Sequence, residues 1–167
     1  KMEIRLAFPN EVNAVMKVIE DAKKTLAKAG SDQWQNDYPN TDIIVDDIIS
    51  GQAYVALEEG EVIAYAAVTR SPESAYDAIF EGKWQGGESE YLVFHRIAVA
   101  AANQGQKVAQ TFLEGLIEGF DYLDFRSDTH AENKIMQHIF EKLGFQHVGK
   151  VPVDGERLAY QKVKSNV

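Results

Sequence analysis

Residues 90–109, EYLVFHRIAVAAANQGQKVA, decide the fold of this chain. The β-branched and aromatic residues at 90–99 predict a strand, which the small and polar residues at 100–106 interrupt. Apolar residues at helical spacing then predict a helix that starts near Lys107. The first backbone N–H groups of a helix are unpaired and the helix dipole adds partial positive charge, so this arrangement predicts an anion site. An ordinary turn before a core helix has the same pattern.

Outward from this stretch, periodic apolar residues predict strands at 2–6, 52–58, 61–70, 122–126, 145–148 and 157–163. They predict helices from Pro9 to Gly30, from a cap at Thr41 or Asp42 to Gly51, and over residues 131–143. Residues 71–89 predict an irregular excursion with at most one short helix, because they contain proline and three glycines. The resulting order, βααβββαβαββ, predicts a mixed α/β fold, and the length of 167 residues predicts a single domain over 1–167.

The composition excludes several classes of site and partner. The chain has no cysteine, which rules out disulfides, cysteine zinc sites and thiol nucleophiles and fits a reducing cytoplasm. A formal net charge of -9 opposes binding to nucleic acid; it either favours cationic small molecules or serves only solubility. No apolar run approaches the ~18 residues that span a bilayer, so we expect no membrane partner and a cytoplasmic location.

Two segments resemble a known family. Residues 126–134, RSDTHAENK, and 140–145, FEKLGF, resemble the C-terminal half of the GNAT superfamily of acyl-CoA N-acyltransferases, in which an asparagine opens a helix that closes on Leu-Gly-Phe. Residues 104–109, QGQKVA, resemble that family's pyrophosphate loop, Arg/Gln-x-x-Gly-x-Gly/Ala. The resemblance covers essentially the whole chain. It implies a mostly antiparallel sheet, flanked by helices, with a split between central parallel strands, and it implies acetyl-CoA as cosubstrate.

The resemblance also implies which residues bind acetyl-CoA. Residues 97–99 match the strand segment whose backbone pairs with the pantetheine arm and holds the thioester carbonyl. Lys107 departs from the pattern, because it stands where the family has the central glycine of its loop. Its ammonium either contacts the anionic cofactor or is solvated while the backbone makes the contacts. The implied cofactor-binding residues are Ile97, Ala98, Val99, Gln104, Gly105, Gln106, Lys107, Val108, Ala109, Asn133 and Phe140.

Asn133 and Phe140 match two further positions of the family. Asn133 matches an asparagine whose amide reaches coenzyme A or an ordered water, although an asparagine near a helix start also serves as a cap. Phe140 stands where many members carry a tyrosine that protonates the departing thiolate. Phenylalanine cannot donate a proton. Either another group does so, or the thiolate leaves unassisted, since the pKa of a thiol is only about 8.5.

Few side chains are candidates to accept the proton of an attacking amine. His95 precedes the thioester segment on the expected strand and histidine titrates near neutral pH, so His95 is the candidate base. Asn133 is the second catalytic candidate. An ordered water and His130, in the turn before the helix expected at 131–143, are alternatives to His95. His138 and His147 are less well placed.

The resemblance implies that two loops, 31–40 and 71–89, frame the acceptor. Their large aromatic residues form either a wall for the alkyl part or the charge of an amine, or a small core under the loops: Trp34, Tyr38, Tyr76 and Trp84. Glu88 and Glu90 either hold a cationic amine or are merely solvated. The acceptor-binding candidates are Trp34, Tyr38, Trp84 and Glu90.

The sequence therefore predicts an N-acetyltransferase that moves acetyl from acetyl-CoA directly to a primary amine of a small molecule or peptide. The alternative is a non-catalytic acyl-CoA-binding sensor module, which Phe140 and the lack of an obvious base favour. No metal is expected, because the four histidines lack ligand spacing. The sequence is compatible with a homodimer. The acceptor itself depends on loops, which vary most within a fold.

Overall fold

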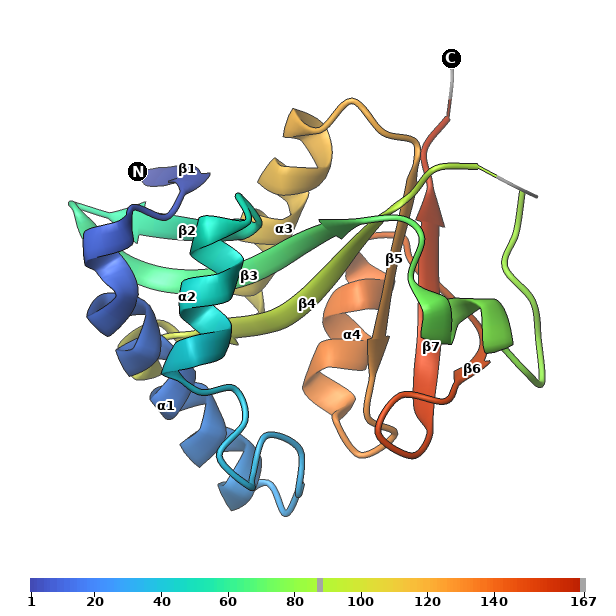
Figure 1. Ribbon diagram of the computed structural model, residues 1–167, viewed down its shortest axis with the longest axis horizontal. Coiled ribbons are helices and arrows are strands. Elements are labelled where there is room, and N and C mark those ends of the chain that lie inside the picture. The colour runs from blue at the N-terminus through green and yellow to red at the C-terminus, as the bar shows by residue number, and fades with distance from the viewer. Residues whose placement is uncertain (87–88, 166–167) are drawn as a thin grey trace. The chain divides into compact units, whose positions relative to one another are not determined.

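The computed structural model describes residues 1–86 and 89–165 (Figure 1). Within these residues, seven strands form a sheet in the order β1-β2-β3-β4-β5-β7-β6. The strands are β1 Met2–Leu6, β2 Ala53–Glu58, β3 Glu61–Arg70, β4 Leu92–Val99, β5 Asp124–Thr129, β6 Gln146–Val151 and β7 Arg157–Val163. β4 and β5 pair in parallel, whereas β1–β2, β2–β3, β5–β7 and β6–β7 are antiparallel pairs. The expected mixed, mostly antiparallel sheet is confirmed.

Helices connect the strands in the order that the sequence predicts, βααβββαβαββ. The α-helices are α1 Val12–Lys28, α2 Thr41–Ile49, α3 Gln106–Gly119 and α4 Lys134–Lys142. Short 3-10 turns are η1 Pro9–Glu11, η2 Ser74–Ala78 and η3 Ala101–Asn103. Within the described part of residues 71–89, η2 is the one helical turn, so the irregular excursion is confirmed there.

Several boundaries differ from the prediction: β4 begins at residue 92 rather than 90, and β6 covers Gln146–Val151 rather than 145–148. At α2 and α4 the reason is an asparagine side chain that satisfies a backbone N–H. Asn40, rather than Thr41 or Asp42, caps α2, and its Oδ1 accepts a hydrogen bond from the Ile43 N–H at 3.1 Å. β5 starts later than predicted, at Asp124, and runs further, to Thr129, because its backbone pairs with β7 from Asp124↔Val163 to Thr129↔Leu158. α4 starts at Lys134 rather than at residue 131, because Asn133 is its cap.

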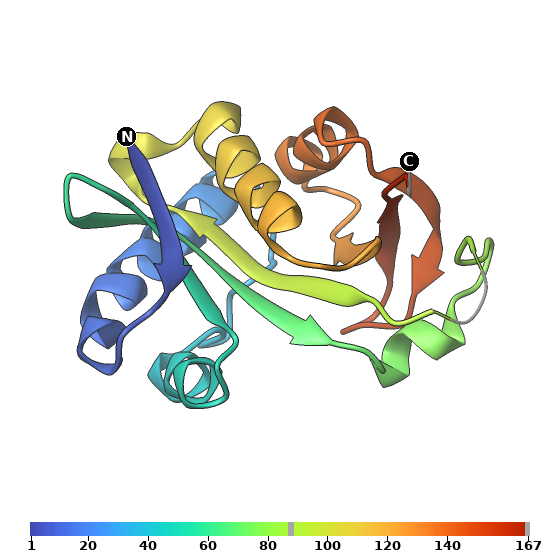
Figure 2. The same cartoon turned by 90° about the horizontal axis from the view of Figure 1, so that it is seen from above.

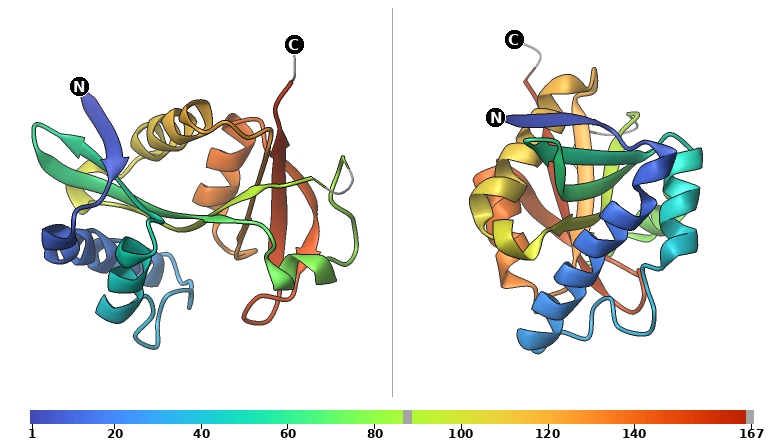
Figure 3. Two further views of the ribbon diagram at one scale, coloured as in Figure 1. Left: turned by 45° about the horizontal axis from the view of Figure 1, so that its top comes forward. Right: turned by 90° about the vertical axis from the view of Figure 1, so that its left-hand side faces the viewer.

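The described chain clusters into two compact units, and β3 and β4 contribute residues to both. Unit 1 comprises Lys1–Val68 and Arg96–Leu116. In it, α1 and α2 lie on one face of β1–β3 and α3 lies on the other (Figure 3). Its core contains Val15, Val18 and Ile19 of α1, Ile44 of α2, and Val55, Leu57, Tyr65 and Ala98 of the sheet.

Unit 2 comprises Thr69–His95 and Ile117–Val167. Here α4 and η2 lie on opposite faces of the strands (Figure 2). Successive side chains of β7 point to opposite faces of the sheet. Ala159 belongs to a core cluster with Tyr76 of η2, whereas the Tyr160 ring lies 5.1 Å from that of Phe140 on α4. The single domain expected over 1–167 stays a prediction.

Candidate functional site

In the turn between β4 and α3, the backbone is exposed to solvent at Gly105. Gly105 has a φ of 154°, which L side chains rarely adopt, and it directly precedes α3. Among the described residues other than its two chain neighbours, a Cβ built at Gly105 would meet no atom within 4 Å. As at every helix start, the first N–H groups of α3 have no partner within the helix, and the helix dipole makes this end partly positive. The expected strand, glycine turn and helix are therefore present, in a shape suited to an anion.

Lys107, the second residue of α3, adds a positive charge to this turn. It is exposed and forms no hydrogen bond or ion pair in the part of the chain that the structure describes. A cation at a helix N-terminus is unfavourable, because the dipole there is already positive. An anionic ligand would relieve that repulsion. The next two residues face inward: Val108 is half-buried and Ala109 is buried.

The side chain of Gln104 holds the turn together. Its Oε1 accepts a hydrogen bond from Thr25 Oγ1 at 2.7 Å, and its Nε2 donates to the Val99 carbonyl at 3.2 Å. At the other end of η3, the Ala101 N–H donates to Asp21 Oδ2 at 2.8 Å. Both the oxygen and the nitrogen of the Gln104 side-chain amide are therefore hydrogen-bonded within the chain. These two bonds explain why a glutamine stands at this position: it fixes the shape of the turn.

The segment expected to meet the thioester ends β4. Ala98 is buried in the unit 1 core, while Ile97 and Val99 are half-buried. The Ala100 N–H continues the sheet by donating to the Ile63 carbonyl at 2.8 Å. The parallel register of β4 with β5 runs from Leu92↔Phe125 to Phe94↔Ser127, and His95 follows it directly.

A buried ionic network lies beside this segment, and the sequence analysis missed it. Arg96 has a φ of 53° in the middle of β4, although it is not a glycine. Its guanidinium donates to both carboxylate oxygens of Asp47 on α2, at 2.9 and 2.7 Å. The Tyr65 hydroxyl donates to the same carboxylate at 2.5 Å. Burial raises the pKa of Tyr65, and the Asp47 charge raises it further.

A signal for this network exists in the sequence. Asp47 lies three residues after Ile44 and one before Ile48, so helical spacing places it on the apolar face of α2. A carboxylate on a buried face requires a partner. Nothing in the sequence identifies that partner as Arg96, which is 49 residues away.

The structure separates the two aromatic candidates of the first loop. Tyr38 is exposed, and its hydroxyl oxygen accepts a hydrogen bond from Arg96 Nη1 at 3.0 Å. Trp34 is half-buried and packs against the unit 1 core cluster. Trp34 therefore acts as a core residue, whereas Tyr38 presents a positioned phenol to solvent.

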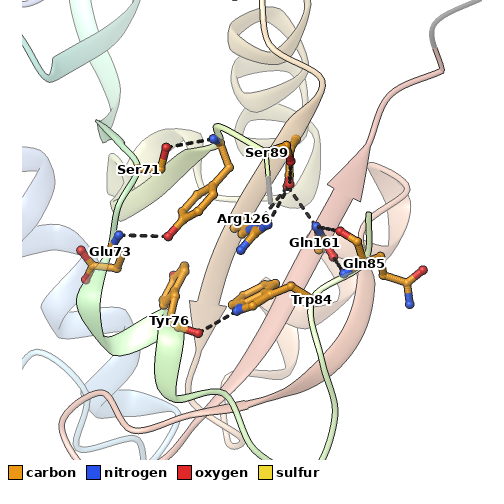
Figure 4. A network of polar contacts seen from close by, with 10 residues as sticks. Ser71, Glu73, Tyr76, Trp84, Gln85, Ser89, Arg126 and Gln161 are labelled. Atoms are coloured by element: carbon orange, nitrogen blue, oxygen red, sulfur yellow. Dashed lines mark hydrogen bonds and ion pairs between the residues drawn. The ribbon is translucent and has the colours of Figure 1, made fainter. Parts of the chain in front are cut away.

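In unit 2, Trp84 belongs to a polar and aromatic cluster (Figure 4). Its indole N–H donates to the Tyr76 carbonyl at 2.8 Å, and its ring lies 5.0 Å from that of Tyr76. The Arg126 guanidinium lies 4.5 Å from the Trp84 ring centroid and 3.9 Å from that of Tyr91. Trp84 and Tyr76 therefore have the structural role that the sequence left open, a small core under the excursion.

Asp124 completes the cluster around Arg126. It accepts two hydrogen bonds from the guanidinium, at 3.1 and 2.9 Å, and others from Ser89 and Gln161 at 3.0 Å each. Gln161 also binds the backbone of Gln85: its Oε1 accepts from the Gln85 N–H, and its Nε2 donates to the Gln85 carbonyl (Figure 4). Through its bonds with Ser89 and Gln161, this buried charge pair links the excursion to β5 and β7.

The remaining polar candidates are Glu88, Glu90, His95 and His130. Glu90 is exposed two residues before β4, and Glu88 lies outside the described residues. His95 is half-buried in β4, directly before Arg96, and His130 is half-buried directly after β5. The roles of these residues stay predictions.

Asn133 and Phe140 both have structural partners in α4. The Asn133 Oδ1 accepts a hydrogen bond from the Met136 N–H at 3.0 Å, so this residue is the helix cap and presents only its Nδ2 to other groups. The Phe140 side chain is fully buried, with its ring 5.1 Å from both Phe145 and Tyr160. The motif thus coincides with a helix cap and a core position.

A second buried carboxylate occurs at the end of β5. Asp128 accepts a 2.5 Å hydrogen bond from the Tyr76 hydroxyl, and Arg157 lies 3.9 Å away. Burial raises the pKa of Asp128, while Tyr76 and Arg157 oppose the shift. The Tyr76 pKa is raised as well, by burial first and then by the Asp128 charge.

Two features are absent from the described ranges, 1–86 and 89–165. None of their helices has the length and apolar character needed to cross a membrane. They contain no group of three or more His, Cys, Asp or Glu side chains that could hold a metal ion.

Comparisons with known proteins extend these observations. The family model of the acetyltransferase (GNAT) domain matches residues 50–147, which include β4, the glycine turn and α3. A solved GNAT family acetyltransferase from Streptococcus agalactiae is 55% identical, with 99% of this chain and 96% of that chain covered and a TM-score of 0.96. Among curated proteins, no significant match was found.

Two more distant solved structures share the fold. A putative acetyltransferase from Salmonella typhimurium, yncA, solved with its cofactor acetyl-CoA, is 18% identical over 100% of this chain and 96% of that chain, with a TM-score of 0.66. AAC(6')-Ib, solved with ribostamycin and coenzyme A, is 16% identical over 98% of this chain and 93% of that chain, also with a TM-score of 0.66.

Proposed function

The chain belongs to the GNAT family of acetyltransferases, and we propose that it transfers acetyl from acetyl-CoA directly to a primary amine of a small molecule or peptide. The observation that carries this proposal is the turn after β4. Gly105 leaves its backbone open, α3 begins directly after it, and Lys107 is an unpaired cation there within the described residues. A diphosphate fits these three features together.

The cofactor is held chiefly by backbone in this proposal. The N–H groups at the start of α3 bind the diphosphate, and the Lys107 ammonium adds a charge contact. The end of β4, residues 97–99, pairs with the pantetheine arm and polarises the thioester carbonyl through its N–H groups. Asn133 and Phe140 stay candidates on the family motif alone, since Asn133 Oδ1 caps α4 and Phe140 is fully buried.

The reaction needs two reactants held together and one proton acceptor. The amine nitrogen attacks the acetyl carbonyl carbon and forms the new C–N bond; the C–S bond then breaks, and coenzyme A leaves as its thiolate. His95, or a water that it orients, takes the proton that the amine loses. Proximity supplies much of the rate, since the transfer occurs within one complex.

A cationic amine is the acceptor class that we propose. The net charge of -9 attracts cations, and Tyr38 presents an exposed phenol to a ligand. AAC(6')-Ib, which shares the fold, was solved in complex with ribostamycin and coenzyme A. The lack of cysteine supports a reducing cytoplasm as the place of action.

A calorimetric titration with acetyl-CoA, followed by thiol-release assays over a panel of amines, tests the proposal. We expect binding and a rise in thermal stability, because a ligand that binds only the folded state stabilises it by mass action. We also expect release of coenzyme A with at least one cationic amine. Binding without release on any amine would instead support the acyl-CoA sensor that Phe140 suggests.

A further inference from the structure

We infer that Asp21 and Thr25 of α1 are positioning residues for the cofactor. In this inference, which rests on the proposed function, they hold the turn after β4 in the shape that binds the diphosphate of acetyl-CoA. The two side chains lie four residues apart, so they share one face of the helix. Neither belongs to the motif of the turn itself, which is about 80 residues further along the chain.

Each residue holds one end of the turn. Asp21 Oδ2 accepts from the Ala101 N–H at 2.8 Å, where η3 begins. Thr25 Oγ1 donates to Gln104 Oε1 at 2.7 Å, directly before Gly105. Gln104 passes this anchorage to the strand by donating to the Val99 carbonyl at 3.2 Å.

Beyond the bond from the Ala100 N–H to the Ile63 carbonyl at its start, the described part of the turn has few other bonds to fix its shape. Its own backbone bonds are a 2.9 Å contact from the Asn103 N–H to the Ala100 carbonyl and a weaker 3.4 Å contact from the Gln104 N–H to the Ala101 carbonyl. Ala101, Gln104 and Gly105 are exposed. Gly105 is also the residue type with the greatest conformational freedom. Without the two side chains of α1, the turn would populate more conformations, and the apparent affinity would fall by the fraction that remains competent.

The charge of Asp21 argues for a positioning role. A carboxylate beside an anion-binding turn repels the anion, so on charge alone it weakens binding. Its hydrogen bond to the backbone accounts for its presence, because a charged acceptor makes a stronger bond to an N–H than a neutral one does. Hydrogen bonding and charge therefore have opposite effects on affinity, and two substitutions can separate them.

The Thr25 test compares two variants in calorimetric titrations with coenzyme A and with adenosine 3′-phosphate 5′-diphosphate, the fragment that carries the diphosphate. Thr25→Val keeps the shape but loses the hydroxyl, and we expect it to weaken both ligands by the same factor, about 3- to 10-fold. Thr25→Ser restores the hydroxyl and is expected to recover parental affinity. Equal affinities in all three proteins would overturn the inference.

The Asp21 test separates hydrogen bond from charge. Asp21→Asn keeps an acceptor for the Ala101 N–H and removes the repelling charge, so it is expected to bind coenzyme A at least as tightly as the parent. Asp21→Ala removes both and is expected to bind several-fold more weakly. Glu20→Ala, which removes a neighbouring carboxylate paired with Lys23 on the same helix, is the matched control and is expected to leave affinity unchanged. Equal gains in Asp21→Asn and Asp21→Ala would show a pure charge effect and overturn the inference.

Steady-state kinetics distinguish positioning from loss of fold. Thr25→Val and Asp21→Ala are expected to raise the KM for acetyl-CoA while kcat and the KM for the amine stay near parental values. A fall in kcat with an unchanged KM for acetyl-CoA would contradict the inference. If the parent itself fails to bind coenzyme A, the proposed function fails; if the parent binds and the variants match it, only the inference fails.

Discussion

The Asp47 carboxylate holds the Arg96 guanidinium through two hydrogen bonds, 2.9 Å from Nε and 2.7 Å from Nη2. Arg96 has a φ of 53°, a left-handed conformation that is strained for any residue with a side chain. The pair joins α2 to β4 directly before residues 97–99, so it supports the strand at the point where we expect the thioester.

We expect Asp47→Ala to destabilise the protein by about 3–5 kcal/mol, because it leaves the Arg96 charge and the Tyr65 hydroxyl without their shared partner. Urea unfolding measures the change. The double variant Asp47→Ala/Arg96→Gly is the informative companion: it removes both charges and places glycine at a positive φ, so it is expected to destabilise less than Asp47→Ala alone. An Asp47→Ala loss below about 1 kcal/mol would show that the pair contributes little.

Substitution at Gly105 is expected to weaken acetyl-CoA binding. Its φ of 154° disfavours any side chain, and a branched one would also occupy the open face of the turn, so Gly105→Val is expected to bind more weakly than Gly105→Ala. Gly51, with a φ of 69° and open space around it, supplies the control, since Gly51→Ala adds backbone strain away from the turn. Calorimetry decides. Parental affinity in Gly105→Val would mean that this turn is not the phosphate cradle.

Charge reversal at Lys107 tests its contact with the cofactor. If the ammonium contacts the diphosphate, Lys107→Glu is expected to lose much more affinity for acetyl-CoA than Lys107→Gly, because only glutamate adds a repelled charge. The difference is expected to shrink as salt rises, since salt screens exposed charges. Titrations at two salt concentrations measure both effects. Equal affinities of the two variants would support a solvated lysine.

His95→Ala is expected to lower kcat/KM by roughly 10²-fold if His95 is the base, while affinity for acetyl-CoA stays within a few-fold. The rate–pH profile is also expected to lose the limb that reports the base. A variant with parental activity and the same profile would transfer the role to an ordered water or to His130.

The raised pKa of Asp128 predicts a pH effect on stability. A carboxyl whose folded-state pKa lies above its unfolded value of 3.8 binds its proton more tightly in the folded protein. Its contribution is therefore greatest at low pH and falls as the pH rises through that window. We expect the stability of the parent relative to Asp128→Asn to fall as the pH rises from about 3.8. Unfolding of both proteins across the acid range measures this difference, and a constant difference would contradict the assignment.

The sequence by itself determined the element order and the place of the anion-binding turn. Both are local properties. Alternating apolar residues predict β4, helical spacing predicts α3, and Gly105 between them predicts a turn, because each depends on residues close together in the chain. The family resemblance rests on local motifs of the same kind, and the GNAT family model matches residues 50–147, which contain all of them: 104–109, 126–134 and 140–145.

Only the tertiary structure decided which side chains are engaged. Gln104 looks like a ligand-binding residue in the motif, but its amide is held by Thr25 and by the Val99 carbonyl. Trp84 is a candidate substrate-binding aromatic by sequence, but in the structure its half-buried ring contacts the Tyr76 ring and the Arg126 guanidinium. Their partners come from distant parts of the chain, so sequence spacing carries no information about them.

The same reason explains the network that the sequence did not reveal. Helical spacing marks Asp47 as a carboxylate on a buried face of α2, but its partner Arg96 lies on β4 and is brought to it only by packing. A buried charge requires a partner for energetic reasons, and the sequence contains 17 lysines and arginines among which the fold selects one. Local patterns thus determined where the backbone would bind, whereas packing decided which charged and polar groups meet.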